Sequence, residues 1–561
     1  MSADSVQSKV AEAILKALEL AKNSKALECE VPIKLTLERP KNRDHGDYAT
    51  SVALSLAKQA NLQPRVIAQV IIDNLTRNDL LASAGISKVE IAGPGFINIT
   101  LETASQAADI VKIVSLGKKY GTGNFLAGKK INLEFVSANP TGPLHLGHTR
   151  WAAVGDSLGR VLSAAGAEVT REFYVNDRGN QMDLFGASIR AAALNQPRPE
   201  DGYHGAYIED LAKEIMKNNP EFISLPETES ISAFRDAGYK LQLDEQNRVL
   251  NNFGTNFDIW FSEKSLYEHN FFDHSLQKLK SQGHVYDLDG AIWLRTTDFG
   301  DDKDRVMIKS DGSFAYFASD SAYYVSKKER GFNLCIYMLG ADHHGYVGRI
   351  KALAACAGDD QDKDVEILIG QMVKIIENGE ELKLSKRAGT IITLEELVEK
   401  VGKDAARYTL IRYPTDTPMV MDVDLLRKNT NDNPVYYVQY AHARICAVLR
   451  NAKELGISYG VDIFKPELLV HERERELIGL LTEFPRVVAS AAEMREPHRV
   501  ARYIEDLAGQ YHRFYNDCRV LPLGDEKPTE LNSSRATLCL ATAQVISNGL
   551  DLLGVSAPEK M

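Results

Sequence analysis

The stretch KINLEFVSANPTGPLHLGHTRWAAVGDSLGRVLSA, residues 130–164, decides the fold of the central part of the chain. It begins with a short, mostly apolar segment, INLEFVS, that is typical of a buried strand. A loop rich in proline and glycine follows, and from His148 to about Ala165 the residues have the period of a helix. A strand, a glycine-bearing loop and a helix in this order open a nucleotide-binding α/β unit. The stretch therefore predicts a Rossmann-type parallel sheet.

Two histidines mark the start of the predicted helix. His145 and His148 are three residues apart and therefore lie on one face of its first turn. The N–H groups and the dipole of a helix N-terminus favour anions, and imidazole donors placed there can hold the phosphates of ATP. Gly147 leaves room for a flat base against the backbone. A surface helix that begins with two solvated histidines is the alternative, and the short HxGH pattern alone leaves both interpretations open.

A second, basic segment lies some 240 residues further along the chain. Lys383, Ser385 and Lys386 belong to a polar loop, KLSKRAG, ahead of the helical TLEELVEKVG. Lysines beside small residues suit a loop that closes on phosphates, because an ammonium group is a compact charge that can follow a leaving pyrophosphate. A basic loop that is merely solvated is the commoner case. The two segments together are therefore a stronger signal than either one alone.

The rest of the chain divides into regions around this unit. Residues 1–115 combine helical segments with the alternating KVEIAGPGFINITL, and residues 185–300 are charged, mainly helical and poor in strand signals. The apolar runs NLCIYMLG and VEILIG are typical of buried parallel strands. From about Asp422 nearly every segment has helical period. The sequence thus predicts a multidomain α/β protein. Its parts are a small α+β domain (1–115), a Rossmann catalytic domain (116–424) with a helical insertion near 185–300, and an all-helical domain (425–561).

Composition excludes several classes of protein. A chain of 561 residues is too long for one core, and 44% hydrophobic with 25% charged residues is ordinary for a soluble globular protein. No run approaches the roughly 18 apolar residues of a membrane span, and the N-terminal residues look like an amphipathic helix rather than a signal peptide. Six scattered cysteines without a CxxC pair argue against a zinc site and favour a reducing compartment. The net charge of −11 does not exclude RNA binding, because distant charges are screened.

Segments from about residue 30 to the C-terminus resemble the arginyl-tRNA synthetases. They are EFVSANPTGPLHLGHTRWAAVGDSLGRVL, FYVNDRGNQM, DGYHGAYIEDLA, GADHHGYVGRIKAL, LSKRAGTIITLEELVEKVGKDAARY, NPVYYVQYAHARI and DLLGVSAP. Within them, HLGH and KLSK are similar to the HIGH and KMSKS signatures of class I aminoacyl-tRNA synthetases. The resemblance implies that L-arginine is activated with ATP and Mg²⁺ to arginyl-adenylate, and is then transferred to the 3′ end of tRNA(Arg). It also implies a cytoplasmic monomer without a membrane partner or a protein-bound structural metal.

The same resemblance implies roles for individual residues. Catalytic roles fall to His145, His148, Lys383 and Lys386. The ATP contacts are these four with Gly142, Gly147 and Ser385. The arginine-binding residues are Glu134, Ser137, Asn139, His148, Tyr316, Asp320 and Asp342, of which Asp342 stands where some relatives carry glutamine. The candidates for tRNA binding are Asn42, Asp44, Tyr48, Tyr440 and Arg444.

The chemistry of arginine agrees with part of this set. A guanidinium presents five donors in a planar fork and is best held by a carboxylate. Tyr316 and Asp320 are four residues apart, so they share one face of a helix. A solvated helix-surface charge is the commoner fate of an aspartate, and here the resemblance favours the pocket.

In the C-terminal region Tyr, Phe, Arg and His are interleaved as for base stacking, but most recur at helical spacing, so we expect more than half of the aromatics in the core.

Three other functions compete with this interpretation. A nucleotidylyltransferase also uses HxGH, but such enzymes are usually much shorter and lack a helical C-terminal domain of this kind. A synthetase of another specificity is the second, although a cysteine enzyme would want zinc ligands that the cysteine spacing does not supply. A non-catalytic tRNA-binding relative would tolerate losing His145, His148 or Lys386, and all three are present. An ATP–pyrophosphate exchange assay across amino acids, with and without tRNA, separates these possibilities.

Overall fold

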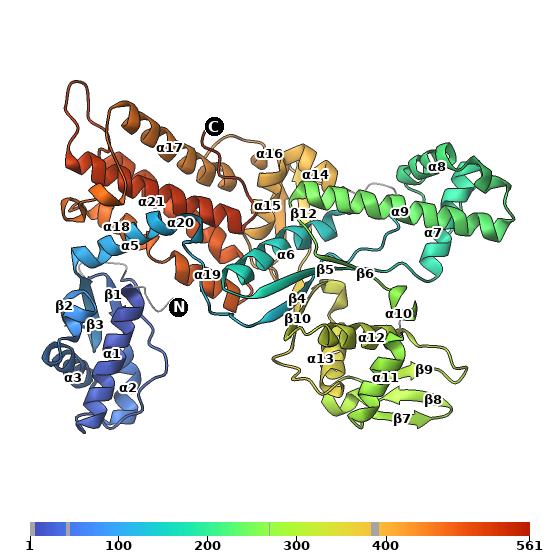
Figure 1. Ribbon diagram of the computed structural model, residues 1–561, viewed down its shortest axis with the longest axis horizontal. Coiled ribbons are helices and arrows are strands. Elements are labelled where there is room, and N and C mark those ends of the chain that lie inside the picture. Colours follow the sequence, from blue (N-terminus) through green and yellow to red (C-terminus); the bar gives the residue numbers. More distant parts are fainter. Residues whose placement is uncertain (1–5, 41–44, 269, 383–391) are drawn as a thin grey trace.

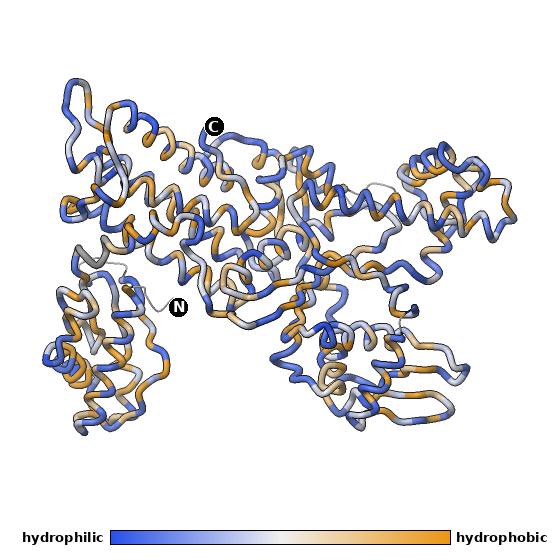
Figure 2. Tube along the Cα trace, viewed as in Figure 1, coloured by the Kyte–Doolittle hydropathy of each residue, from blue (hydrophilic) through white to orange (hydrophobic). Residues whose placement is uncertain are grey.

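The computed structural model of the protein describes residues 6–40, 45–268, 270–382 and 392–561. Figure 1 shows an elongated molecule in which a central parallel sheet is flanked on both sides by other units. The C-terminal helices and the N-terminal unit lie at one end, and a long helical hairpin with a small antiparallel sheet lies at the other. Along the C-terminal helices, hydrophobic and hydrophilic residues alternate, as Figure 2 shows. None of the helices in the described ranges is long and apolar enough to span a bilayer.

The N-terminal unit has a hydrophobic core of its own. Its elements are α1 (Val6–Asn23), β1 (Tyr48–Thr50), α2 (Val52–Ala60), α3 (Pro64–Arg77), α4 (Leu80–Ser83), β2 (Ile86–Ala92) and β3 (Phe96–Leu101). The strands form an antiparallel sheet in the order β1-β3-β2. Gly95 lies in the turn that joins β2 to β3. Its φ of +144° is a backbone conformation that residues with an L side chain rarely adopt. Helix α5 (Thr103–Leu116) then leads to the rest of the chain.

The central sheet is the element that positions the site. It is parallel, with the order β11-β10-β4-β5-β6. The strands are β4 (Lys130–Glu134), β5 (Glu168–Val175), β6 (Ile259–Ser262), β10 (Leu334–Gly340) and β11 (Val365–Gly370). Helix α6 (Leu146–Ala164) connects β4 to β5 and packs closely on the sheet, since a Cβ at Gly155 would come within 2.3 Å of the Phe135 ring. The strand, loop and helix expected from residues 130–164 are therefore present.

The segment between β5 and β10 contains more strand than the sequence indicates. It begins with the helices α7 (Asn180–Ala193), α8 (Ala206–Asn218) and α9 (Glu227–Phe253), and it continues with β6, α10 (Ser265–Glu268), α11 (Phe271–Ser281), β7 (Val285–Leu288), β8 (Ala291–Leu294), β9 (Arg305–Ile308) and α12 (Tyr316–Glu329). Strand β6 joins the central sheet, and β7, β8 and β9 form an antiparallel sheet. The sequence carries strand signals at GAIWLRT and RVMIKSDGSFAYF, the segments that form β8 and β9. Strands β6 and β7, by contrast, have four residues each, which is too short for a clear alternating pattern.

The remaining elements complete the central part and build the helical end. Around the site they are α13 (Tyr346–Cys356), β12 (Val373–Glu377), β13 (Glu380–Glu381), α14 (Leu394–Val401), α15 (Lys403–Ile411), β14 (Met419–Asp422) and α16 (Val423–Leu426). The C-terminal helices are α17 (Pro434–Glu454), α18 (Glu472–Leu481), α19 (Phe484–Glu493), α20 (His498–Asp517) and α21 (Glu530–Leu552). One continuous hydrophobic core runs from strand β4 through α6 into α20 and α21. The helical end and the sheet are therefore packed as one body.

A partly buried arginine, Arg39, joins the N-terminal unit to the C-terminal helices. Arg39 Nε donates to Glu483 Oε1 at 3.1 Å, and Nη2 donates to Thr482 Oγ1 at 3.0 Å. The Tyr48 hydroxyl accepts from the same Nη2 at 3.4 Å, and Tyr48 is only 2% exposed. The approach depends on Gly479, because a Cβ there would lie 2.0 Å from Arg39 Nη1.

Candidate active site

The two histidines of HLGH cap the N-terminus of α6. His145 is the N-cap residue, and its Nδ1 accepts a hydrogen bond from the Gly147 backbone N–H at 3.1 Å. The backbone N–H of His145 in turn donates to His148 Nδ1 at 3.4 Å, and the ring centroids are 3.9 Å apart. Since both Nδ1 atoms accept, the proton of each neutral ring is assigned to Nε2. Two N–H donors thus stand beside the positive end of a helix dipole.

The segment that follows residues 383–391 pairs with this loop. His145 forms an isolated antiparallel bridge with Thr393. Leu146 N donates to Ile392 O at 3.2 Å, and Leu394 N donates to Leu144 O at 2.9 Å. The C-terminal boundary of the basic segment is therefore held against HLGH. Lys383, Ser385 and Lys386 themselves lie outside the described residues.

The loop between β4 and α6 is held by neighbouring helices. It leaves the strand through Val136 and Ser137, both in the left-handed region with φ +69° and +43°. Asn139 Nδ2 donates to Gln181 Oε1 at 2.8 Å. Gln246, on α9, donates from Nε2 to the carbonyls of Asn139 and Gly142 at 3.1 and 2.8 Å. The helical hairpin thereby fixes the backbone that carries the predicted ATP and arginine contacts.

Glu134, the last residue of β4, is already paired with a buried lysine. Its Oε2 accepts from Lys327 Nζ at 2.6 Å and from the Tyr323 hydroxyl at 2.9 Å, and its Oε1 accepts from Ser137 Oγ at 3.2 Å. Lys327 is fully buried and lies over the rings of Tyr323 and Tyr337. The charge of Glu134 is thus matched from within the protein.

A second buried carboxylate supports the same network. Glu172 on β5 pairs with Arg330 and accepts a hydrogen bond from the Tyr323 hydroxyl at 2.5 Å. Burial alone would raise the pKa of Glu172, but the charges of Lys327 and Arg330 hold that pKa below its ordinary value. The network clamps α12 onto β4 and β5, and so it fixes the helix that carries Tyr316 and Asp320.

Asp320 differs from Glu134 because its carboxylate lacks such a partner. Its Oδ2 is covered from solvent and makes no hydrogen bond with any residue of the described ranges. Burial raises the pKa of Asp320 to about 7; Arg349 lowers it, and the carboxylates of Glu263 and Glu134 raise it further. An unpaired, covered carboxylate oxygen is a costly feature that a cationic ligand would relieve.

Two tyrosines and a further acid surround Asp320. Burial and the nearby Asp320 raise the pKa of Tyr346. Tyr316 is 69% exposed at the start of α12, so its ring is open to solvent. Glu263 follows β6, and burial raises the pKa of Glu263 as well. Aromatic rings beside carboxylates suit a planar cation such as a guanidinium.

If Asp320 is the residue that holds the guanidinium, as the sequence predicts, its raised pKa predicts weaker arginine binding at acidic pH. Below about pH 7 the carboxyl of the ligand-free protein is protonated, whereas a guanidinium pairs with the carboxylate. Binding therefore releases a proton, and the dissociation constant for arginine should rise about tenfold for each pH unit below the pKa and level off above it. Calorimetric titration on either side of pH 7 measures this slope. The Asp320→Asn variant should lose the slope, and a pH-independent dissociation constant in the unaltered protein would contradict the prediction.

Asp342 lies at the expected edge of the sheet but points to solvent. It belongs to the short 3₁₀ turn Ala341–His343 directly after β10, the strand beside β4. Its side chain is 82% exposed, and its Oδ2 lies 3.6 Å from His343 Nε2. Within the described ranges, no three His, Cys, Asp or Glu side chains are grouped to hold a metal ion.

The residues predicted to bind tRNA fall into three situations. Tyr440 and Arg444 lie on α17 among partly exposed rings, where Tyr436 and Tyr440 stack at 5.9 Å and Arg444 covers Tyr515 at 4.4 Å. Tyr48 is buried against Arg39, so in this structure it joins domains and does not face solvent. Asn42 and Asp44 lie outside the described residues.

Several residues of the site were not identified from the sequence. They are Glu172, Gln246, Glu263, Tyr323, Lys327, Arg330 and Arg349. A signal for two of them exists, because Tyr316, Asp320, Tyr323 and Lys327 follow one another at spacings of four, three and four along one face of α12. The others come from separate elements and are brought together by the tertiary fold.

Comparison with known families now assigns the class. The arginyl-tRNA synthetase N-terminal domain matches residues 4–101, the class I tRNA synthetase (R) catalytic domain matches 109–444, and the DALR anticodon-binding domain matches 438–561. The fold and site are therefore those of a class I aminoacyl-tRNA synthetase, a ligase that uses ATP. Because the catalytic match spans more than half of the chain, the chain belongs to the arginyl-tRNA synthetase family.

Solved structures agree with this assignment. A Campylobacter jejuni protein assigned as an arginyl-tRNA synthetase is 33% identical with a TM-score of 0.74, covering 82% of this chain and 100% of that one. Arginyl-tRNA synthetases of Thermus thermophilus and Plasmodium falciparum share the fold at the same TM-score. The Thermus thermophilus protein is 21% identical, and the match covers 98% of this chain and 99% of that one. The Plasmodium falciparum protein is 17% identical, and the match covers 100% of both chains.

The reaction follows from the family. The protein is an arginine–tRNA ligase that converts arginine and ATP to arginyl-adenylate and pyrophosphate, and then transfers the arginine to tRNA(Arg) with release of AMP. The prediction made from HLGH, KLSK and their flanking segments is confirmed at this level, and so is the predicted fold class. The roles of individual residues and the boundaries of the domains remain predictions.

Proposed function

We propose that Asp320 selects arginine by pairing with its guanidinium group. The observation that carries this assignment is the covered Asp320 Oδ2 atom, which has no hydrogen-bond partner in the described ranges. Tyr316 and Tyr346 would flank the planar group, and Glu263 would add negative charge. Glu134 is the weaker candidate for this task because Lys327 already neutralises it.

The other predicted contacts suit the reacting end of arginine. Glu134, Ser137 and Asn139 stand where β4 leads into HLGH, and Glu134 is bonded to Ser137 and to Tyr323 of α12, the helix that carries Asp320. In this arrangement the Oε1 side of Glu134 and the amide of Asn139 would orient the α-amino and carboxyl groups. Asp342, at the same edge of the sheet, would contribute from solvent. In this arrangement the pocket around Asp320 holds the guanidinium end of arginine, and the loop between β4 and α6 holds its α-amino and carboxyl end.

Activation requires the arginine carboxylate to attack the α-phosphorus of ATP. The new bond joins a carboxylate oxygen to phosphorus, and the bond to the β-phosphate oxygen breaks so that pyrophosphate leaves with the electron pair. Nε2–H donors of His145 and His148 at the positive end of α6 would stabilise charge on the phosphate oxygens. Lys383, Ser385 and Lys386 would bind the leaving phosphates, while Gly142 and Gly147 leave room for the nucleotide.

Magnesium would enter with the nucleotide rather than as a resident ion. Mg²⁺ prefers oxygen ligands and keeps several waters, so phosphates and water can hold it without a dedicated protein cage. Transfer follows when a ribose hydroxyl at the 3′ end of tRNA attacks the arginyl carbonyl carbon and AMP leaves.

We propose further that two regions hold the tRNA. The helical domain, residues 425–561, would bind the anticodon, and the N-terminal domain, residues 1–115, would contact the outer corner. The catalytic domain, residues 116–424, lies between them in the chain. The family match to an anticodon-binding domain and the partly exposed stack of Tyr436 and Tyr440 on α17 support the first role. We also propose a cytoplasmic monomer without a membrane partner.

Tyr440 and Arg444 provide a test of the anticodon contact. Tyr440→Ala should raise the KM for tRNA(Arg) roughly tenfold or more, since stacking of one base on an aromatic ring contributes about 1–3 kcal/mol. Arg444→Ala should reduce the salt slope of tRNA binding by about one. Arg444→Lys keeps the charge and should keep the slope. The KM for arginine should stay the same in all three variants, and an unchanged KM for tRNA would refute the contact.

Specificity itself is tested by ATP–pyrophosphate exchange across the amino acids. In the presence of tRNA(Arg), arginine should support exchange, and citrulline, which lacks the charge, should not. Exchange that is supported equally by lysine would argue against planar, bidentate recognition at Asp320.

A further inference from the structure

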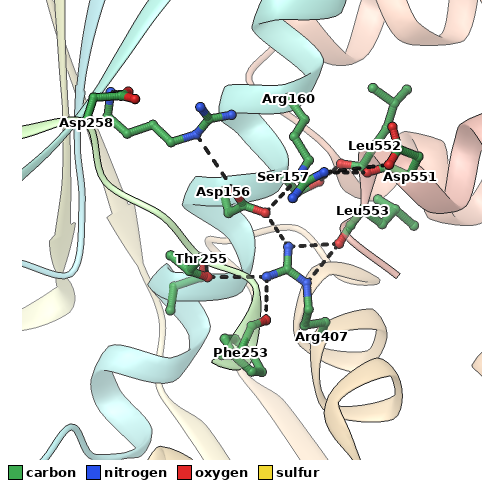
Figure 3. Close-up of polar contacts among 12 residues, drawn as sticks. Asp156, Ser157, Arg160, Phe253, Thr255, Asp258, Arg407, Asp551, Leu552 and Leu553 are labelled. Carbon is green, nitrogen blue, oxygen red and sulfur yellow. Dashed lines mark hydrogen bonds and ion pairs between the residues drawn. The ribbon is translucent and has the colours of Figure 1, made fainter. Parts of the chain in front are cut away.

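A buried ion pair lies where the C-terminal helices meet α6. Asp156 on α6 accepts a hydrogen bond from Arg407 Nη2 on α15 at 2.5 Å (Figure 3). The side chains are 3% and 0% exposed. A buried ion pair is weak evidence for stability, because apolar residues of similar volume often stabilise as well or better. What the pair adds is a defined position of α6 relative to α15.

All five N–H donors of Arg407 are engaged. Nε donates to Leu553 O at 3.1 Å, and Nη1 donates to Phe253 O at 3.1 Å and Thr255 Oγ1 at 3.3 Å. Nη2 donates to Leu553 O at 3.0 Å as well as to Asp156. Phe253 ends α9 and Leu553 follows α21, so one side chain caps the C-terminal ends of two helices, where carbonyls need partners and the dipole favours a cation.

Helix α6 makes further contacts with the end of α21. Ser157 Oγ donates to Leu552 O at 2.9 Å, and Arg160 Nη1 donates to Asp551 O at 3.3 Å (Figure 3). Arg160 Nε also donates to Asp156 at 2.8 Å. Figure 3 shows these side chains converging from α6 on the turn that ends α21. The catalytic helix is thus fixed directly to the last helix of the C-terminal part.

A glycine makes this close approach possible. Gly554 has φ +66°, and a Cβ at this position would lie 2.2 Å from Arg407 Nη2. A side chain there would therefore displace the guanidinium from its acceptors. Gly554 offers a way to disturb the cluster without removing any of its charges.

The joint connects both halves of the ATP site to the helical domain. Helix α6 begins with His145 and His148, and α14, which precedes α15, begins at Thr393 in its bridge to His145. Helix α21 belongs to the part that matches an anticodon-binding domain. Because a guanidinium in contact with four acceptors permits one arrangement, a shift of α21 must move α6 and α15 with it or break hydrogen bonds.

We propose that Asp156 and Arg407 are positioning residues that couple anticodon binding to the rate of arginylation. The proposal rests on the anticodon contact proposed above for the helical domain. Binding of the correct anticodon would hold α21 in the position that aligns HLGH and the segment after KLSK. A wrong anticodon would then lower kcat as well as raise KM, although the catalytic side chains are untouched.

The test compares tRNA(Arg) with the same transcript carrying a substituted anticodon base. In the unaltered protein the substitution should raise KM and lower kcat, with a coupling of about fivefold to 150-fold in kcat. In Arg407→Lys and Gly554→Ala the kcat ratio between the two transcripts should fall towards one, while the KM ratio persists. Ser157→Ala removes a single hydrogen bond and should give a smaller shift in the same direction, so it serves if the other two variants do not fold.

Arg495→Lys is the matched control. Arg495 also joins the helical part to the sheet, through Glu366 at 2.8 and 2.9 Å. Its side-chain hydrogen bonds within the described ranges go to Glu366 and to the Ala492 carbonyl, and not to α6 or α15. It should leave both ratios unchanged. Two results would overturn the coupling. One is an equal loss of kcat with both transcripts in the Arg407, Gly554 and Ser157 variants. The other is the same loss of discrimination between transcripts in Arg495→Lys. An unaltered protein whose KM ignores the anticodon would instead refute the anticodon contact.

Discussion

His148→Ala is expected to lower kcat for ATP–pyrophosphate exchange about 10²- to 10³-fold, the usual loss when one preorganised donor to a developing charge is removed. The donor acts on negative charge that builds on the phosphate in the transition state. Although His148 is also among the predicted arginine contacts, the dissociation constant for arginine should therefore change far less than the rate. His148 sits on the first turn of α6 with its ring against His145, which places it where the α-phosphate is expected. Lys386→Ala should behave in the same way.

The His148 result needs a control for folding, because its Nδ1 also accepts the N-cap hydrogen bond of α6. His148→Asn keeps an acceptor near that position and loses the imidazole, so it should lose exchange activity without the loss of stability that accompanies a missing cap, about 1 kcal/mol. His274→Ala, an exposed histidine on α11, should be neutral. Severe loss of arginine binding together with a normal rate of the chemical step would count against the assignment.

Asp320→Asn should remove most of the preference for arginine over citrulline. Loss of one partner from a buried charged pair costs about 3–5 kcal/mol, and citrulline does not depend on that pair. The discrimination is measured as the ratio of kcat/KM for exchange with each amino acid. The Asn side chain keeps the shape, so the folded structure and citrulline binding should be retained.

A second aspartate provides the matched control for specificity. Asp342→Asn makes the same chemical change at a solvent-exposed side chain after β10. Because arginine and citrulline share the α-amino and carboxyl groups that Asp342 is proposed to help hold, this variant should alter the discrimination far less. If Asp320→Asn left the preference unchanged, the guanidinium would have to lie elsewhere, and Glu263 and Glu134 would be the next carboxylates to test.

The sequence predicts the parts of this site that are continuous in the chain. Strand β4, its loop and α6 follow from one stretch, because the change from apolar strand to helical period is local. The helix face of Tyr316 and Asp320 follows from their spacing. By contrast, the neutralisation of Glu134 by Lys327 joins residues 193 positions apart, and local patterns do not indicate such a pairing.

Two departures from expectation have definite physical causes. The strands β6 and β7 are four residues long, so each shows at most two cycles of alternation. Tyr48 was predicted to bind tRNA, but Arg39 draws it into the contact between the N-terminal unit and the C-terminal helices. Contacts between distant parts of a chain leave no local signal in the sequence. From the sequence alone, an aromatic residue at such a contact therefore cannot be distinguished from one that is exposed to solvent.

The saturation of Arg407 by carbonyls near the end of the chain has a consequence for biosynthesis. Its acceptor Leu553 lies 146 positions downstream, and Ser157 reaches Leu552 across 395 positions. While the polypeptide emerges from the ribosome, the sheet and its nucleotide-binding helix are complete in sequence long before these acceptors exist. The nascent protein must therefore hold the Arg407 guanidinium without its hydrogen-bond acceptors in an incompletely folded core, a state that favours chaperone binding. A premature stop shortly before residue 553 would make that state permanent, so such products are expected to be degraded rather than to persist as partly active fragments.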